Sequence, residues 1–252
     1  MAGEVRILGV DGIPEAKPGD DLIELIMSGL AQSNLTLEEG DIVVVTHKFV
    51  SKAEGRVIEL AQVTASDLAT RWAETYGKDP RHVEVVFQEA ARIVRMDHGL
   101  IIAETRHGFV CANAGVDASN VAGHTAVSML PIDPDASARG IREGLEQRVG
   151  FAPAIIITDS FGRPWRRGIM NIAIGSAGIN PLLDYRGQFD DQGYEMHATV
   201  MAIADEIASA AELVMNKLDR RPVALVRGYA YEPSDVGAAE SMVMSADRDL
   251  FR

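Results

Sequence analysis

The sequence predicts an α+β protein in which helices combine with mixed, largely antiparallel sheets. Helix and strand patterns alternate along the 252 residues without the regular strand–helix–strand rhythm of a doubly wound fold. Two neighbouring strands, over residues 100–103 and 109–112, are joined at His107-Gly108, as in an antiparallel hairpin. The length suits one large domain or two small ones, and neither a repeat nor a linker divides the chain.

The first half of the chain is expected to hold three helices and one buried strand besides the hairpin. A helix opens at residues 20–26, where an acidic residue at the N-cap precedes apolar residues at helical spacing. The β-branched run over 42–45 follows Gly40-Asp41 and predicts a buried strand. Two more helices are expected over 66–76 and 82–96.

The second half is expected to continue with a helix over 135–149, a strand over 154–158, a long helix over 197–217 and a strand over 222–226. The long helix carries one apolar stripe at helical spacing, which favours a core or a subunit interface. Glycine-rich segments at 115–123 and 168–178 are expected to connect elements.

Composition and charge exclude several classes of protein. The chain is 47% hydrophobic and 24% charged, as in ordinary globular proteins, and its net charge of −13 excludes nucleic-acid binding through a broad basic surface. Cys111 is the single cysteine, so an intrachain disulfide and a cysteine-based zinc site are both excluded. Neither a secretory signal nor an apolar segment of membrane-spanning length is present. We expect a cytoplasmic protein without a membrane partner.

Two aspartates follow predicted strands and are candidate metal ligands. Asp117 comes after the strand over 109–112, and Asp159 comes directly after the strand over 154–158, with Ser160 beside it. Carboxylate and hydroxyl oxygens suit hard cations such as Mg²⁺ or Mn²⁺, and Mg²⁺ commonly takes one or two protein carboxylates and fills its shell with phosphate and water. Aspartates at such places also serve as caps or turn formers, and spacing leaves both interpretations open.

Two basic segments are candidates for anion binding. The segment "SKAEGR" offers Lys52 and Arg56 after the strand over 42–45, although it lacks the glycines of a Walker A loop and also fits a solvated turn. The segment "DSFGRPWRRG" places three arginines around a tryptophan, which suits phosphates, carboxylates and a stacked ring but also fits a surface charge run. Its members are Arg163, Trp165, Arg166 and Arg167. His47, His107 and His124 show no metal-ligand spacing.

Seven segments, in order along nearly the whole chain, resemble the coenzyme F420-0:L-glutamate ligase family, also called F420 gamma-glutamyl ligases. They are "GIPEAKPGDDL", "VSKAEGRV", "CANAGVDASNV", "ITDSFGRPWRRG", "AIGSAG", "DEIASAAELVM" and "PVALVRG". The resemblance implies an enzyme that uses GTP and a divalent metal ion to join L-glutamate to coenzyme F420-0 and to extend a gamma-glutamyl tail. It also implies a two-part α+β fold that forms an intertwined homodimer.

The resemblance also assigns roles to particular residues. Asp117, Asp159 and Ser160 match metal-binding positions, with Mg²⁺ or Mn²⁺ as the cation and K⁺ as a further candidate, and Asp117, Asp159 and Lys52 become the catalytic candidates. Arg163, Trp165, Arg166 and Arg167 are the candidates for substrate binding. Nucleotide-contacting positions fall on Gly12, Ile13, Pro14, Glu15, His47, Lys48, Lys52, Asn120, Met215 and Lys217.

This chain departs from the family pattern at three places. Relatives carry Gln or Glu two residues beyond the methionine as a further metal ligand, where this chain has Lys217; either the metal shell is completed otherwise, or Lys217 contacts phosphate. His47-Lys48 replaces smaller polar residues. Some relatives continue into a C-terminal domain related to nitroreductases, whereas here a single ligase domain of two intertwined subdomains is expected over 1–252.

Three other functions remain open at this stage. The chain could ligate an amino acid to a different carboxylate acceptor with the same site. It could be a nucleotide-binding subunit without catalysis, which the pair Asp117 and Asp159 argues against. It could also be a metal-dependent hydrolase, which would release phosphate without glutamate.

Overall fold

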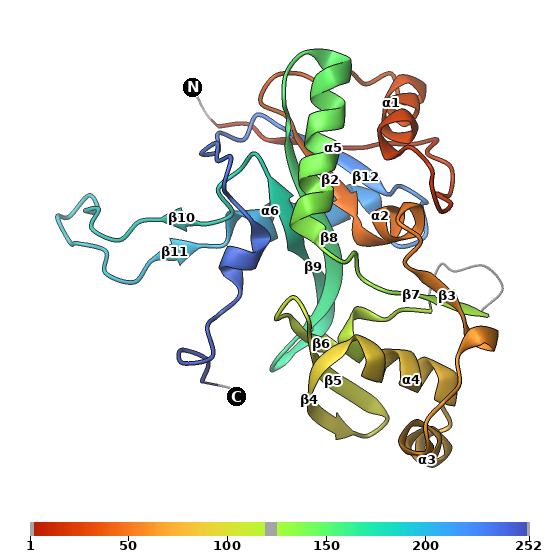
Figure 1. The fold of residues 1–252 in the computed structure, drawn as a ribbon. Helices are drawn as coiled ribbons and strands as arrows, with labels where there is room; N and C mark the ends of the chain where they lie inside the picture. Colours follow the sequence, from red (N-terminus) through yellow and green to blue (C-terminus); the bar gives the residue numbers. More distant parts are fainter. Residues whose placement is uncertain (1–2, 119–124, 251–252) are drawn as a thin grey trace.

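A five-stranded mixed sheet forms the centre of the computed structural model, which describes residues 3–118 and 125–250 (Figure 1). Its strands lie in the order β1, β12, β2, β8, β9, and all neighbours are antiparallel except the parallel pair β2–β8. Their bounds are Arg6–Gly9, Val223–Arg227, Ile42–Thr46, Ala154–Arg163 and Arg166–Ala177. The predicted combination of helices with mixed and antiparallel sheets is confirmed.

Helices cover both faces of this sheet. Helices α1 (Leu22–Gln32), α2 (His47–Ala53) and α5 (Pro134–Val149) pack on one face around a buried apolar cluster that includes Val43, Val45, Ile155 and Ile157. Helix α6 (Ile203–Met215) packs on the other face against the alternate residues of the same strands. Because β2 is buried on both faces, its sequence is a continuous β-branched run instead of an alternating one.

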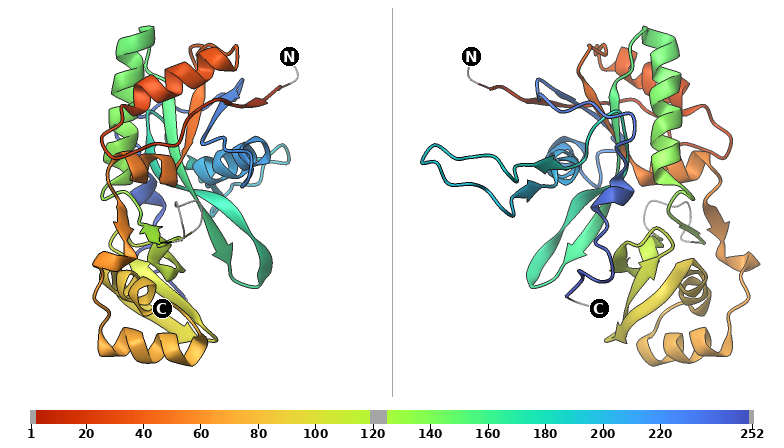
Figure 2. Two further views of the ribbon diagram at one scale, coloured as in Figure 1. Left: turned by 90° about the vertical axis from the view of Figure 1, so that its right-hand side faces the viewer. Right: turned by 60° about the vertical axis from the view of Figure 1, so that its left-hand side comes forward.

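A smaller sheet packs with two helices around a separate apolar cluster. Its strands β4 (Ala90–Asp97), β5 (Leu100–Thr105) and β6 (Val110–Ala112) are antiparallel, and helices α3 (Asp67–Tyr76) and α4 (Pro80–Glu89) cover them. The strands β3 (Val57–Glu59) and β7 (Ala126–Ser128) pair beside it. Figure 2 shows this part beneath the central sheet in both further views.

Two hairpins project from the body of the molecule (Figure 2). One is the β8–β9 hairpin, which turns at Pro164-Trp165. The other is a long arm closed at its base by β10 (Leu183–Asp184) and β11 (Val200–Met201). Short 3-10 turns complete the described chain at η1 (Leu60–Gln62), η2 (Asn113–Gly115) and η4 (Ala239–Met242). None of the helices in 3–118 and 125–250 is long and apolar enough to cross a bilayer.

Three expectations about local structure were wrong in part. The helix expected over 82–96 ends at Glu89, and the rest forms β4, because His98-Gly99 turns the chain back into β5 with positive φ at both residues, as a tight hairpin turn requires. The long helix begins only at Ile203. The segment expected to connect elements over 168–178 is strand as far as Ala177, and its Gly175 lies where a Cβ would come within 2.4 Å of the Pro134 carbonyl oxygen.

A left-handed turn precedes Asp117. Asn113, Ala114 and Gly115 have φ of 53°, 51° and 73°, a conformation that costs residues with a Cβ roughly 1–2 kcal/mol each. A Cβ on Gly115 would also lie 2.7 Å from Leu130 Cγ. Glycine is therefore required at this position by both its φ and its surroundings.

We expect Gly115→Ala to lower the free energy of unfolding by about 2–4 kcal/mol, from left-handed strain and overlap with Leu130. The control is Gly140→Ala inside α5, where no atom lies within 4 Å of the added Cβ and a gain of about 0.5–1 kcal/mol is expected. Urea unfolding of the two variants measures both values. Equal stabilities would contradict the required left-handed turn.

Candidate functional site

The register of the two parallel strands sets the position of the first candidate residues. Thr46 at the end of β2 lies beside Thr158 of β8, and α2 begins at the next residue, His47. His47 therefore meets Asp159, and its Nε2 lies 3.1 Å from Asp159 Oδ1. Both side chains are largely buried, with 3% and 15% of their surface exposed. Asp159 lies inside β8, which continues to Arg163, and not at a strand end as expected.

Asp159 is held in its ionised form. Burial by itself raises the pKa of Asp159, but the neighbouring His47, the Ser160 N–H and the charge of Lys48 outweigh burial and keep that pKa below its usual value. The Ser160 N–H donates to Asp159 Oδ1 at 2.6 Å. The other ring nitrogen of His47 lies 3.4 Å from Ser51 Oγ, one helical turn along α2. A buried carboxylate is thus available for a cation.

Lys48 brings the second candidate carboxylate to the same helix. Its Nζ donates to Asp117 Oδ2 at 2.6 Å, while its charge also acts on Asp159. The backbone of Asp117 is fixed by reciprocal hydrogen bonds with Ser128 at 3.0 and 2.9 Å. The structure therefore places the two aspartates around one lysine, although 42 residues separate them in the sequence.

Lys52 connects α2 to the N-terminal candidate stretch. Its Nζ donates to Glu15 Oε1 at 2.8 Å, and this hydrogen bond lowers the pKa of Glu15. Gly12 and Pro14 of the same stretch are exposed, whereas the Ile13 side chain is buried against Gly29 of α1. The stretch can therefore offer its backbone and the Glu15 carboxylate to a ligand, but not the Ile13 side chain.

Ser160 belongs to a cluster on the opposite face of β8, because successive side chains of a strand alternate between faces. Its Oγ donates to Asn171 Oδ1 at 2.6 Å, and Asn171 Nδ2 donates to Glu212 Oε2 of α6 at 2.9 Å. Lys217 Nζ donates to Ser160 Oγ. The three expected metal ligands are thus distributed over two faces, with Asp117 and Asp159 on the α2 face.

The two residues assigned at the end of α6 differ in what they can reach. Met215 is fully buried in the apolar cluster beneath α6, so its side chain is not presented to a ligand. Asn216 has a positive φ of 51° and ends the helix. Lys217 then returns to the polar cluster, where its Nζ also lies 3.5 Å from Glu212 Oε1. Lys217 is the cation of this second cluster.

The arginine-rich segment forms the tip of the β8–β9 hairpin. Trp165 is 85% exposed at the turn, with a φ of 59°. Arg163 donates to the Met170 sulfur at 3.0 Å, while Arg166 and Arg167 are exposed. Six residues separate Asp159 from Trp165, so the tip lies roughly 20 Å along the strand from the α2 cluster. The structure does not bring these four residues into that cluster.

The donor set fits a cation that is only partly held by protein. No group of three or more His, Cys, Asp or Glu side chains is placed to hold a metal within 3–118 and 125–250. Asp117 and Asp159 are two carboxylates that both interact with Lys48. Carboxylate oxygens suit Mg²⁺ or Mn²⁺ when phosphate and water complete the coordination shell. Asn120, expected at a nucleotide position, lies outside the described residues.

Sequence reasoning missed Asn171 and Glu212, which link β9 to α6. An asparagine inside the apolar run Ile169–Ile174 was the available signal, because a buried amide requires hydrogen-bond partners. The glycines at 168, 175 and 178 instead predict a connection between elements. Glu212 lies on α6, and nothing in the sequence around it indicates a partner. The fold shows that this partner is Asn171 of β9.

The fold and the α2 cluster define an α+β protein in which charged side chains gather at one helix beside a mixed sheet. A family model described as F420-0:Gamma-glutamyl ligase matches residues 12–228, which contain both polar clusters. The chain belongs to this family.

Curated relatives extend over nearly all of the chain. The Coenzyme F420:L-glutamate ligase of Methanothermobacter thermautotrophicus is 42% identical over 251 residues, covering 98% of this chain and 99% of that protein. The protein of the same name from Methanopyrus kandleri is 44% identical, covering 99% and 100%. That from Methanocaldococcus jannaschii is 40% identical, covering 99% and 97%.

Cys111 lies against the site without taking part in it. Burial and the negative charge of Asp159 raise the pKa of the thiol to about 12. The unfolded thiol ionises above about pH 9 while the folded one does not, so ionisation favours the unfolded state as pH rises. The thiol is therefore neutral and unreactive in the folded protein at neutral pH.

We expect the free energy of unfolding of the wild type to fall between pH 9 and 11 more steeply than that of Cys111→Ala, by up to about 1.4 kcal/mol per pH unit. Urea unfolding at several pH values measures the difference, and the groups common to both proteins cancel. Parallel stability curves, or rapid alkylation of native Cys111 at pH 8, would contradict the burial of a neutral thiol.

Proposed function

We propose that this protein is a GTP- and divalent-metal-dependent ligase that adds L-glutamate to coenzyme F420-0 and extends the gamma-glutamyl tail. The observation that carries the proposal is the pair of carboxylates, Asp117 and Asp159, gathered around Lys48 at the start of α2. The names and coverage of the curated relatives support the same activity and acceptor.

The proposed chemistry activates a carboxylate before the amide bond forms. An oxygen of the acceptor carboxylate attacks the γ-phosphorus of GTP, the bond to the β–γ bridging oxygen breaks, and GDP leaves. The amine of glutamate then attacks the acyl carbon, loses a proton and displaces inorganic phosphate. Because every reactant is anionic, the barrier is dominated by charge repulsion and by positioning.

The residues of α2 supply what this chemistry requires. Lys52 and Lys48 provide cations for phosphate oxygens, and the exposed backbone around Gly12 and Pro14 provides a neighbouring surface for the nucleotide. His47 keeps Asp159 oriented and ionised. Asp117 and Asp159 would hold Mg²⁺ or Mn²⁺, which neutralises charge on the phosphate oxygens when bound.

The second cluster has a separate proposed role. Lys217, supported by Ser160 and Glu212, offers a cation on the other face of β8. It would bind an anionic group of a substrate at the position where the family resemblance implies a further metal ligand. In a homodimer, the hairpin tip of one copy would reach the site of the other copy. Its Arg163, Arg166 and Arg167 would contact the substrate bound there.

The test is incubation with F420-0, L-glutamate, GTP and Mg²⁺, followed by mass spectrometry of the coenzyme. A gain of one or more glutamyl residues supports the proposal. A gain on another carboxylate only would favour the paralogous ligase. GDP and phosphate released without glutamate would favour the hydrolase, and nucleotide binding without turnover would favour the non-catalytic subunit.

We expect Asp117→Asn and Asp159→Asn to lower glutamate addition by at least about 100-fold while the far-ultraviolet circular dichroism is retained, because each loses a charge needed for the cation. The control is Asp184→Asn, which removes an exposed aspartate of the arm that pairs with Arg186. Near-normal turnover of either site variant at saturating Mg²⁺ would exclude the metal role.

We expect Lys52→Ala to weaken GTP binding about 10-fold or more, because a cation beside the phosphates is lost. Lys78→Ala is the control, since Lys78 is an exposed lysine between α3 and α4, away from α2. Calorimetric titration with a non-hydrolysable GTP analogue measures both affinities. An unchanged dissociation constant for Lys52→Ala would rule out this contact.

A further inference from the structure

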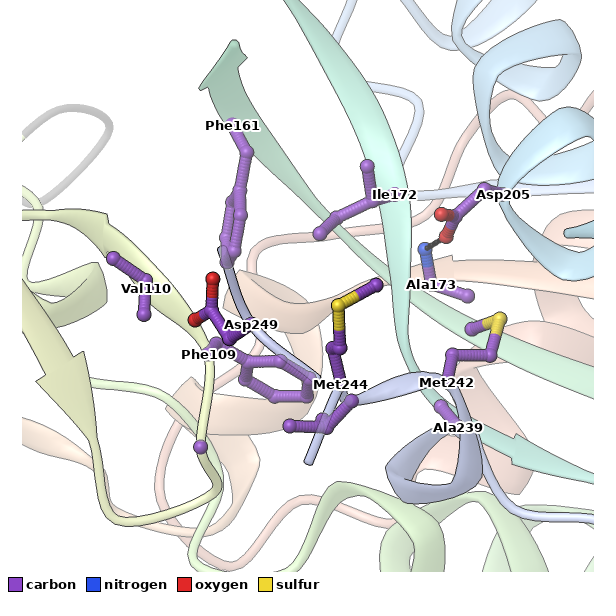
Figure 3. A pocket seen from close by; sticks show the side chains of 12 residues that line it. Phe109, Val110, Phe161, Ile172, Ala173, Asp205, Ala239, Met242, Met244 and Asp249 are labelled. Carbon is purple, nitrogen blue, oxygen red and sulfur yellow. Dashed lines mark hydrogen bonds between the residues drawn. The ribbon is translucent and has the colours of Figure 1, made fainter. Parts of the chain in front are cut away.

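A cavity of about 240 Å³ lies at the edge of the central sheet, between β6, β9 and the C-terminal segment (Figure 3). Its walls are mainly apolar and aromatic. Phe109 and Phe161 meet edge to face with ring centroids 6.2 Å apart, and Met242 and Met244 line the side formed by the C-terminal segment. Flat rings and flexible thioethers are the side chains that best adapt to a planar aromatic ligand.

The cavity begins next to the α2 cluster. Ile172, which lines it, is the cross-strand partner of Asp159, and such pairs lie about 4.5–5.5 Å apart on one face of a sheet. Phe161 lies two residues beyond Asp159 on the same face of β8. A ligand with its ring in this cavity would therefore extend its other end toward Asp159 and α2.

The charges around the cavity favour one orientation of such a ligand. Two carboxylates, Asp205 and Asp249, line the cavity, so an anionic group is repelled from it. Asp205 Oδ1 accepts from the Ala173 N–H at 2.8 Å, which fixes that carboxylate at the rim (Figure 3). The cations Lys48 and Lys52 lie on α2 instead. A planar ring with N–H or O–H donors suits the cavity, and an anionic tail suits α2.

The C-terminal side of the cavity is anchored by a buried carboxylate. Asp135, in the first turn of α5, accepts from the N–H groups of Ser176 at 2.7 Å, Ala239 at 2.9 Å and Glu240 at 3.2 Å. These bonds pin η4 against β9. Met242, the last residue of η4, is thereby held at the cavity, and the chain continues from it to Met244.

Coenzyme F420-0 is a deazaflavin, in which a planar aromatic ring system is joined to a lactyl phosphate tail. We propose that this cavity binds the ring system of the acceptor coenzyme, with the anionic tail directed toward α2. The inference rests on the proposed function and adds the site for the ring. A volume of about 240 Å³ is below the roughly 300–1,000 Å³ that hold whole drug-sized ligands, so the cavity takes the ring portion and leaves the tail outside.

The experiment measures coenzyme binding to variants that fill the cavity from two different elements. Met244 is 59% exposed and Val110 is 42% exposed, so Met244→Trp and Val110→Trp enlarge side chains without opening the core. The control is Val236→Trp, at a 92% exposed position that does not line the cavity. Titration follows the absorbance and fluorescence of the F420-0 ring, with a separate titration of GTP.

We expect both cavity variants to bind F420-0 at least 10-fold more weakly, with an unchanged GTP dissociation constant, and the control to match the wild type. Wild-type affinity in both variants, in a protein that still adds glutamate, overturns the cavity assignment and leaves the proposed function intact. Loss of an oligomer in both, measured by light scattering, assigns the cavity to a subunit contact and also overturns it.

Failure of the proposed function gives a different pattern. A wild-type protein that binds neither F420-0 nor its phosphate-free deazaflavin ring overturns both proposals. A wild-type protein that binds the ring, loses it in both cavity variants, and adds no glutamate overturns the proposed function alone.

Discussion

The contact between His47 and Asp159 depends on the register of β2 and β8, and the rest of the site depends on that contact. Because Thr46 lies beside Thr158, the first residue of α2 meets a buried carboxylate on the neighbouring strand. Residues four apart share a face of a helix, so Lys48 and Lys52 then point the same way, toward Asp117 and Glu15. A shift of one residue between these strands would separate His47 from Asp159.

The charges of the site are balanced within the chain. Asp159 pairs with His47, Asp117 with Lys48 and Glu15 with Lys52, in a protein whose net charge is −13. On the proposed function, an anionic nucleotide would compete with Asp117 and Glu15 for Lys48 and Lys52. A metal ion bound to the carboxylates would free these lysines to contact the nucleotide. Metal and nucleotide would therefore bind with positive cooperativity.

Local patterns predicted the elements whose residues carry their own signal. The β-branched run of β2 and the acid-capped helix α1 were recognisable, since burial on two faces and an N-cap each leave a mark in the sequence. The helix expected over 82–96 was wrong beyond Glu89 because the pairing of β4 with β5 outweighs local preference. The division of Asp159 and Ser160 between two faces was also missed, because β8 was expected to end at Thr158.

The family resemblance supplied the candidate residues, and the fold arranged them. Asp117 and Asp159 belong to segments with no contact evident in the sequence, and only α2 connects them through its first two residues. The hairpin arginines lie elsewhere, at the tip of β8–β9, because the strand continues beyond Asp159.

Transfer of oxygen from the acceptor carboxylate to phosphate tests the central claim most directly. The protein would be incubated with GTP, L-glutamate, Mg²⁺ and F420-0 whose carboxylate oxygens are labelled with ¹⁸O. We predict that the phosphate released as the first glutamate is added carries one labelled oxygen, because the labelled carboxylate attacks phosphorus before the amide forms. Unlabelled phosphate released with that first addition would contradict this mechanism.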